Sequence, residues 1–133
     1  MIQGWHHEDY LILCESQAEA DYLTERYALS GYLPGHTFVG LIGWDDFIVL
    51  DAAGQLHTVP TVPLAAEGLR PLALDITSAI LRPDDELTDK IKWYIQPVVF
   101  GGDPNPGQNM TWVTIDQHID LVKWWNNKFQ ELQ

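Results

Sequence analysis

Residues 36–62 hold three strand-like segments separated by short turn signals, and this stretch constrains the fold more than any other. The first segment, 36–42, is rich in residue types that favour a pleated surface. The second, 47–50, reads Phe-Ile-Val-Leu without interruption. A continuous apolar run of this length is expected of a strand that is buried on both faces.

The link to the third segment has the signature of a tight hairpin. Residues 51–54 read Asp-Ala-Ala-Gly, and Gly54 is suited to a positive φ. Residues 55–59 then alternate polar and apolar side chains before Pro60 and Pro63. Because proline cannot donate to a strand ladder, the third strand must end here or lie at a sheet edge. Together the three segments predict a small antiparallel meander.

A strand and a helix are expected before the meander. Residues 8–14 are apolar and β-prone, and they are followed by a capping-box pattern at Ser16 and Glu19. The pattern predicts a helix over 17–28. Gly31 is a good candidate for the left-handed position that ends such a helix.

The C-terminal segment predicts a second, longer helix. Asp116 is a suitable cap, and a helix over about 117–132 should follow it. Its apolar residues recur at helical spacing and form one expected buried stripe: Leu121, Val122, Trp125, Phe129 and Leu132.

Further strands are expected between these parts, over 91–95 and 98–100 and again over 110–115, while a short helix should start near Thr77. We therefore expect residues 1–133 to form a single α+β domain. Its antiparallel or mixed β-sheet should have about five to six strands, with an N-terminal helix and a long C-terminal helix packed on it.

The charge of the chain is strongly acidic and unevenly distributed. Its 133 residues include 19 acids and 7 bases, giving a net charge of −12. Residues 1–89 carry 15 of the acids and 3 of the bases, whereas residues 90–133 are balanced. This composition argues against binding to nucleic acid or to an anionic membrane. It leaves two interpretations, a solvated face that confers solubility and a negative patch that attracts a cationic partner.

The remaining composition predicts an ordinary cytoplasmic protein without a cofactor. Cys14 is the one cysteine, so no internal disulfide can form. No signal peptide or membrane-spanning run is evident. The run His-His-Glu-Asp at 6–9 is not expected to bind a metal, because neighbouring side chains on a strand point to opposite faces.

Candidate partner-binding residues follow from tryptophan and charge together. Trp44 precedes Asp45 and Asp46 in an expected turn, and tryptophan is a favoured interface anchor. Trp93 and Trp112 are expected to pack in the sheet instead. A second acidic run would add to the attraction of a cation: Asp84, Asp85 and Glu86.

The sequence around the meander resembles the SUKH superfamily. Residues 25–35 end in a Leu-Pro-Gly turn, and 40–51 contain a glycine step and an apolar strand that ends in Asp51. Residues 58–64 resemble the return strand, so the similarity covers about residues 22–64. The resemblance implies an α+β fold and, for bacterial members, a non-enzymatic immunity protein that binds and neutralises a toxin. Many such toxins are basic nucleases, so a cationic protein is the implied partner.

Two other functions remain open from the sequence. One is a small hydrolase-like enzyme that uses His57 or His118 with a carboxylate, although no Gly-x-Ser-x-Gly nucleophile motif is present. A pocket that holds a histidine within hydrogen-bond reach of an acid would favour it. The other is a module that binds a carbohydrate or small ligand on exposed tryptophans, which two parallel indoles lining a cleft would favour.

Overall fold

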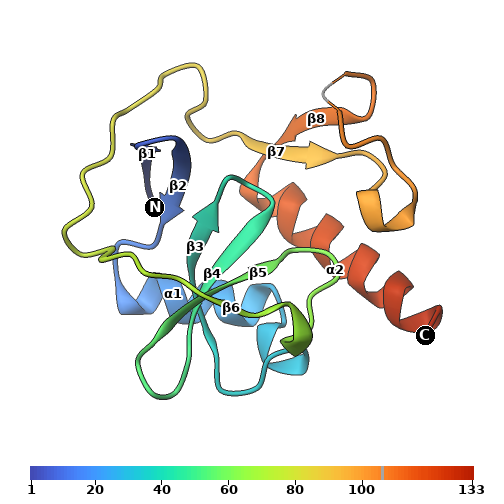
Figure 1. Ribbon diagram of the computed structural model, residues 1–133, viewed down its shortest axis with the longest axis horizontal. Coiled ribbons are helices and arrows are strands. Elements are labelled where there is room, and N and C mark those ends of the chain that lie inside the picture. Colours follow the sequence, from blue (N-terminus) through green and yellow to red (C-terminus); the bar gives the residue numbers. More distant parts are fainter. Residues whose placement is uncertain (106) are drawn as a thin grey trace.

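The computed structural model describes residues 1–105 and 107–133, and it has the expected α+β fold (Figure 1). Six strands form one antiparallel sheet in the order of the chain: β1 (Ile2–His6), β2 (Asp9–Leu13), β3 (Thr37–Ile42), β4 (Asp46–Leu50), β5 (Leu56–Pro60) and β6 (Arg70–Pro71). A second antiparallel sheet and two helices complete it: β7 (Ile91–Tyr94), β8 (Met110–Val113), α1 (Gln17–Arg26) and α2 (Ile115–Glu131).

The central meander of β3, β4 and β5 confirms the sequence prediction. Phe47, Ile48 and Val49 are all fully buried, as expected of a strand covered on both faces. Gly54 takes a positive φ of 84° in the hairpin turn. The third strand ends at Pro60 as predicted, but it is not the edge of the sheet, because β6 pairs with it.

Two strands of the main sheet were not predicted. In β1, Trp5 lies opposite Tyr10 of β2, and His7 turns the chain with a positive φ of 55°. This hairpin was missed because its turn lies in the polar run at 6–9 and because β1 has too few apolar residues to show strand alternation. β6 is only two residues long and includes Pro71, which leaves almost no strand signal.

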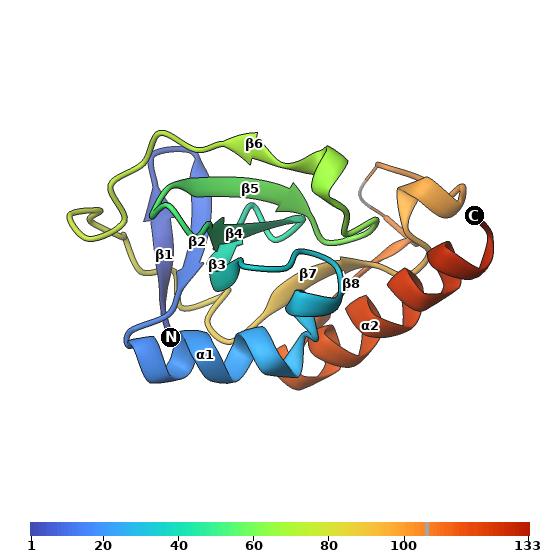
Figure 2. The same ribbon diagram turned by 90° about the horizontal axis from the view of Figure 1, so that it is seen from below.

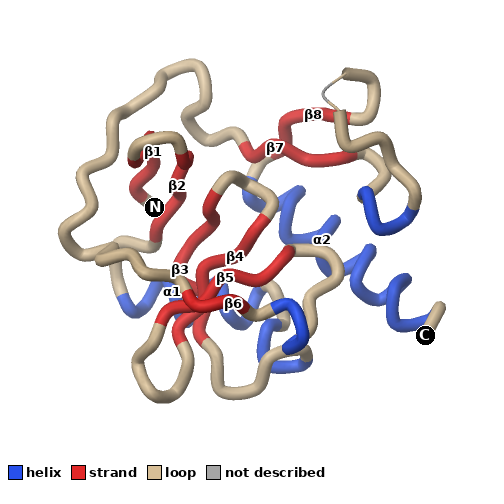
Figure 3. Tube along the Cα trace, viewed as in Figure 1, coloured by secondary structure: helices blue, strands red, loops and turns tan. Residues whose placement is uncertain are grey.

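Both faces of the main sheet are covered, by different means. The two helices cover one face, and α1 runs along it in Figure 2. Apolar side chains of 72–81 cover Leu11, Leu13 and Ile48 on the other. This segment is an irregular loop (Figure 3), so the prediction of a helix near Thr77 was wrong. Instead, Asp75 accepts hydrogen bonds from both the backbone amide and the hydroxyl of Thr77, which form a turn.

Helix α1 begins where the capping signal places it but ends earlier than predicted. The Ser16 hydroxyl accepts the Glu19 amide at 3.1 Å. The Glu19 carboxylate accepts the amide of Glu15, so only half of the predicted capping box forms. The helix ends at Arg26, and Ala28, not Gly31, takes the left-handed conformation with φ of 54°.

Helix α2 is rotated relative to the predicted stripe. Its cap is Thr114, which forms a capping box with Gln117, so the assignment of the cap to Asp116 was wrong. Leu132 is exposed, and the side chains that point inward include two polar ones: His118, Ile119, Val122 and Asn126. A hydrophobic pattern cannot reveal a buried face that contains histidine and asparagine.

The polar residues on the buried face of α2 fix its position on the sheet. The Asn126 amide donates to the carbonyl of Thr61 at 2.8 Å, and its oxygen accepts the amide of Leu64 at 2.7 Å. The Tyr27 hydroxyl and His118 Nδ1 lie 2.7 Å apart and join the end of α1 to α2. These bonds place the chain after β5 against α2, beside the site described below.

The chain after β7 differs from expectation in one element. Residues Val98–Phe100 form a short 3-10 helix, not a strand. Pro97 precedes it and Gly101 ends it with φ of 89°, a combination that favours a tight turn. Across the described residues, no helix combines the length and apolar character needed to cross a bilayer.

Candidate partner-binding surface

An aromatic cluster joins the two sheets. Trp44 lies in the turn between β3 and β4, stacked on Tyr10 with ring centroids 5.0 Å apart. The edges of Trp5 and Trp112 meet it at 6.0 Å and 5.4 Å. We call these four side chains the aromatic cluster. Since Trp112 belongs to β8 and the others to the first hairpins, the cluster fixes the second sheet against the first.

Trp44 is the half-buried centre of the aromatic cluster, not an exposed anchor. Its ring is half-buried, and its indole nitrogen has no hydrogen-bond partner among the described residues. Its φ of 61° is rare for a large side chain, and packing on Tyr10 holds it there. The more accessible indole of the cluster is Trp112, which is 38% exposed although the sequence predicted it to pack in the sheet.

The second acidic run is attached to the same cluster. Asp84 accepts a hydrogen bond from the indole nitrogen of Trp5 at 3.1 Å, while Asp85 and Glu86 are exposed beside it. Burial raises the pKa of Tyr10, and the negative charges of Asp84 and Asp89 raise it further. The structure therefore brings Asp84 and Trp44, which are far apart in sequence, to one cluster through Trp5.

Asp45 and Asp46 have different surroundings although they are adjacent. Asp45 is exposed and forms an ion pair with Lys92 of β7 at 3.1 Å. The Lys92 ammonium also lies 5.0 Å from the ring centre of Tyr94. Asp46 is half-buried and has no hydrogen bond or ion pair from its side chain within the described part of the chain. Burial raises its pKa, and the neighbouring Asp45 adds to the effect.

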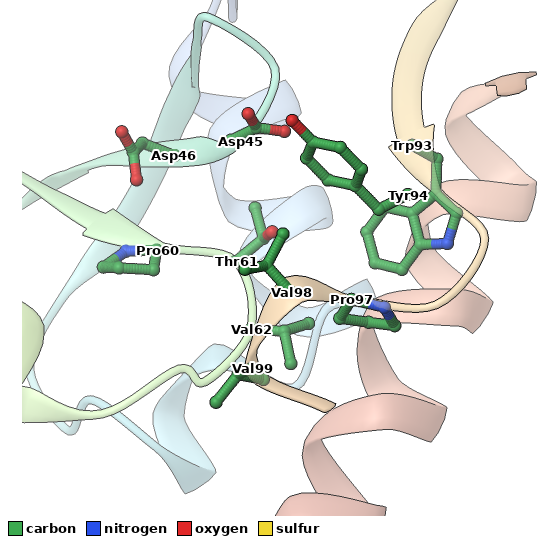
Figure 4. Close-up of a pocket in the computed structure, with 10 residues that line it drawn as sticks. All are labelled: Asp45, Asp46, Pro60, Thr61, Val62, Trp93, Tyr94, Pro97, Val98 and Val99. Carbon is green, nitrogen blue, oxygen red and sulfur yellow. The ribbon is translucent and has the colours of Figure 1, made fainter. Parts of the chain in front are cut away.

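A hollow of about 270 Å³ opens beside Asp46 (Figure 4). It lies between the adjoining ends of β4 and β5 on one side and the chain from β7 to the 3-10 helix on the other. Pairing of Asp46 with Pro60, and a bond from the Thr61 amide to the Asp45 carbonyl, place the first side. We call it the acidic hollow, and ten residues line it: Asp45, Asp46, Pro60, Thr61, Val62, Trp93, Tyr94, Pro97, Val98 and Val99.

Neither candidate catalytic histidine lies in the acidic hollow. His118 is fully buried, and its hydrogen-bond partner is the Tyr27 hydroxyl, not a carboxylate. Burial lowers the pKa of His118 to about 3, so the ring is neutral at pH 7. His57 Nδ1 lies 3.7 Å from an oxygen of Asp51, whose carboxylate accepts amides of the hairpin turn. These environments are typical of structural histidines.

The arrangement of the tryptophans does not match a ligand-stacking cleft. Trp44 and Trp112 are inclined by 83°, Trp5 and Trp44 by 89°, and Trp124 and Trp125 by 81°. Each pair meets edge to face, which favours mutual packing over a flat platform. Trp124 is 57% exposed on α2, and among the described residues no other indole lies parallel to it. Residues 1–105 and 107–133 also contain no group of three or more potential metal ligands.

Several residues of the surface were not found from the sequence. Trp5 and Tyr10 require recognition of β1, since they meet only as a cross-strand pair. Thr61 meets Asp45 and Asp46 through the pairing of β4 with β5, whereas Lys92 meets Asp45 only after the second sheet has packed on the first. One signal was available, because an isolated lysine in an apolar strand suggests a nearby carboxylate. Comparisons with protein-family models, with curated proteins and with solved structures found no match.

The unpaired carboxylate of Asp46 should destabilise the folded chain. We expect Asp46→Asn to raise the free energy of unfolding at pH 7 by about 0.5 kcal/mol, because solvent screens a half-exposed charge. The raised pKa means that the ionised form is the less stable one in the fold. The difference should therefore shrink as pH falls through that pKa.

Urea unfolding of both proteins between pH 4 and pH 7 would measure this effect. Asp85→Asn removes the same charge from an exposed position and serves as the control. A loss of stability in Asp46→Asn would mean that the carboxylate has a stabilising partner, contrary to the structure.

Proposed function

We propose that the chain is a non-enzymatic binding protein of the immunity type, which binds a cationic toxin and thereby neutralises it. The observation that carries the proposal is the unpaired, half-buried Asp46 at an apolar-walled hollow. Partial burial makes an unpaired carboxylate less stable, and a counter-charge from a partner would compensate it. A protein partner with exposed arginine or lysine would provide that counter-charge.

The wider surface supports the same partner. Asp84 reaches the aromatic cluster through Trp5, and Asp45 adjoins it through Trp44. Acids of this kind speed the encounter with a basic protein, whereas apolar and aromatic contacts slow its release. Tyr94 and Trp112 provide accessible aromatic area beside the acids, so both effects are available at one place.

The resemblance to the SUKH superfamily supplies the class of partner, a bacterial toxin such as a basic nuclease. Neutralisation by occlusion needs no catalytic group, which agrees with the structural roles of His57 and His118. The single cysteine is compatible with action in the cytoplasm, where we expect the protein to work.

The proposal predicts a complex with the toxin encoded next to this gene. Isothermal titration should give a saturable interaction, and the double variant Asp45→Lys/Asp46→Lys should weaken it at least about 100-fold. The matched control is Asp21→Lys/Glu25→Lys, which makes the same charge change on the exposed side of α1. Failure to form a complex, or equal effects of the two double variants, would overturn the proposal.

A further inference from the structure

We infer that the acidic hollow receives the side chain of one arginine from the partner. The inference rests on the proposed function, since it names the group by which a cationic protein would be held. The hollow, of about 270 Å³, lies just below the roughly 300–1,000 Å³ that is typical of small-molecule sites. Its size therefore suits a single long side chain better than a separate ligand.

Two residues whose side-chain acceptors have no partner among the described residues line this space. The Asp46 carboxylate has no ion pair within the described residues, although its neighbour Asp45 has one. Thr61 is only 6% exposed, and its hydroxyl takes part in no hydrogen bond among these residues. Figure 4 shows both side chains at the hollow, one from the start of β4 and one from the end of β5. A carboxylate and a hydroxyl accept from different N–H groups of one planar guanidinium.

The apolar walls of the acidic hollow suit the methylene groups of the same arginine side chain. Pro60, Val62 and Pro97 present apolar surface to the hollow, and Trp93 adds an aromatic wall. Val98 and Val99 are about half exposed at its rim. Apolar walls bury the methylene groups of an arginine while its charged end reaches the acceptors. Arginine is also less strongly hydrated than lysine, which favours it where the charge becomes partly buried.

The chain already binds one cation in this way. Lys92 places its ammonium 3.1 Å from Asp45 and over the rings of Tyr94 and Trp44. That internal pair neutralises Asp45 and leaves Asp46 as the open acceptor of the two. The pair of Lys92 with Asp45 thus supports a carboxylate beside aromatic and apolar side chains as a site for a cation. Asp45 is occupied by Lys92, and Asp46 has no cation beside it among the described residues.

The probe is a blocked tripeptide with a central arginine, titrated into the whole isotopically labelled protein and followed by amide shifts in NMR. We expect saturable shifts at residues 46, 61 and 98, with a dissociation constant on the order of 10 mM for so small a ligand. The citrulline tripeptide has nearly the same shape without the charge and should give no saturable shifts. The lysine tripeptide should bind several-fold more weakly.

Two variants test whether the arginine tripeptide binds at Asp46. Asp46→Asn, which we expect to fold at least as well as the parent, should weaken arginine binding at least about tenfold. Asp21→Asn removes an equal charge from the exposed side of α1, outside the candidate surface, and should leave binding unchanged. The inference is overturned if citrulline binds equally, if lysine binds as tightly as arginine, if Asp46→Asn has no effect, or if no saturable shift appears by about 50 mM.

These outcomes separate the two proposals. In one outcome, the toxin complex is sensitive to Asp45→Lys/Asp46→Lys but the arginine tripeptide does not bind in the hollow. That result would overturn only the arginine assignment. Specific arginine binding without a toxin complex would overturn the proposed function and keep the assignment of the hollow.

Discussion

Acidification from pH 6.5 towards pH 3 should remove up to about 1.4 kcal/mol of unfolding free energy per pH unit through His118 alone. Burial lowers the pKa of this ring to about 3, from the ordinary value of 6.5 that it regains on unfolding. Between these values the unfolded chain binds a proton that the folded chain does not. Stability therefore falls as pH falls, and the total loss approaches about 5 kcal/mol.

Comparison of variants by urea unfolding across this pH range separates His118 from the carboxylates. His118→Gln should be less stable at pH 7 by about 1–3 kcal/mol, because Tyr27 loses its buried partner. Its stability should then vary less with pH than that of the parent. Tyr27→Phe disturbs the same contact without removing the imidazole, so it should keep the full dependence. Parallel pH curves for the parent and His118→Gln would show that the ring is not buried as a neutral group.

Gly40→Ala should destabilise the fold by about 3 kcal/mol or more. A Cβ atom at Gly40 would overlap the carbonyl oxygen of Ile12 and press on the side chain of Leu13. The carbonyl belongs to the neighbouring strand, so relief requires β2 and β3 to move apart. The position also adjoins the register shift between Phe38 and Gly40 on the other side of β3, where β3 pairs irregularly with β4.

Gly31→Ala is the matched control, because a Cβ there meets no heavy atom within 4 Å. Its free energy of unfolding should stay within about 0.5 kcal/mol of the parent value. Thermal and urea unfolding of both variants would measure the difference. Equal stabilities would contradict the close packing of β2 on β3.

The parts of the fold that were predictable are those with a simple apolar period. The run at 47–50 and the turn ending at Gly54 define the meander from local sequence alone. Helix α2 was found as an element, yet its buried face was misplaced because His118 and Asn126 point inward. Their burial depends on partners that are distant in sequence, which no local pattern contains.

The candidate site was predictable only where its residues are adjacent in the chain. Asp45 and Asp46 follow Trp44 directly, so their proximity was evident. Their different ion pairing was not evident, because Lys92 from the second sheet pairs with Asp45 and not with Asp46. The placement of Asp84 required a β1 strand that carries Trp5 to the cluster. Tertiary packing, not composition, thus distinguishes a dispersed acidic charge from a surface with an open carboxylate.

The most direct test of the central claim is the association rate constant of the toxin complex as a function of salt. If the acids beside the aromatic cluster attract a cationic partner, the rate should fall at least about tenfold between low and physiological ionic strength. Asp45→Lys/Asp46→Lys should lower the rate at low salt and flatten its salt dependence. A rate that is independent of salt, and unchanged by this charge reversal, would contradict the claim.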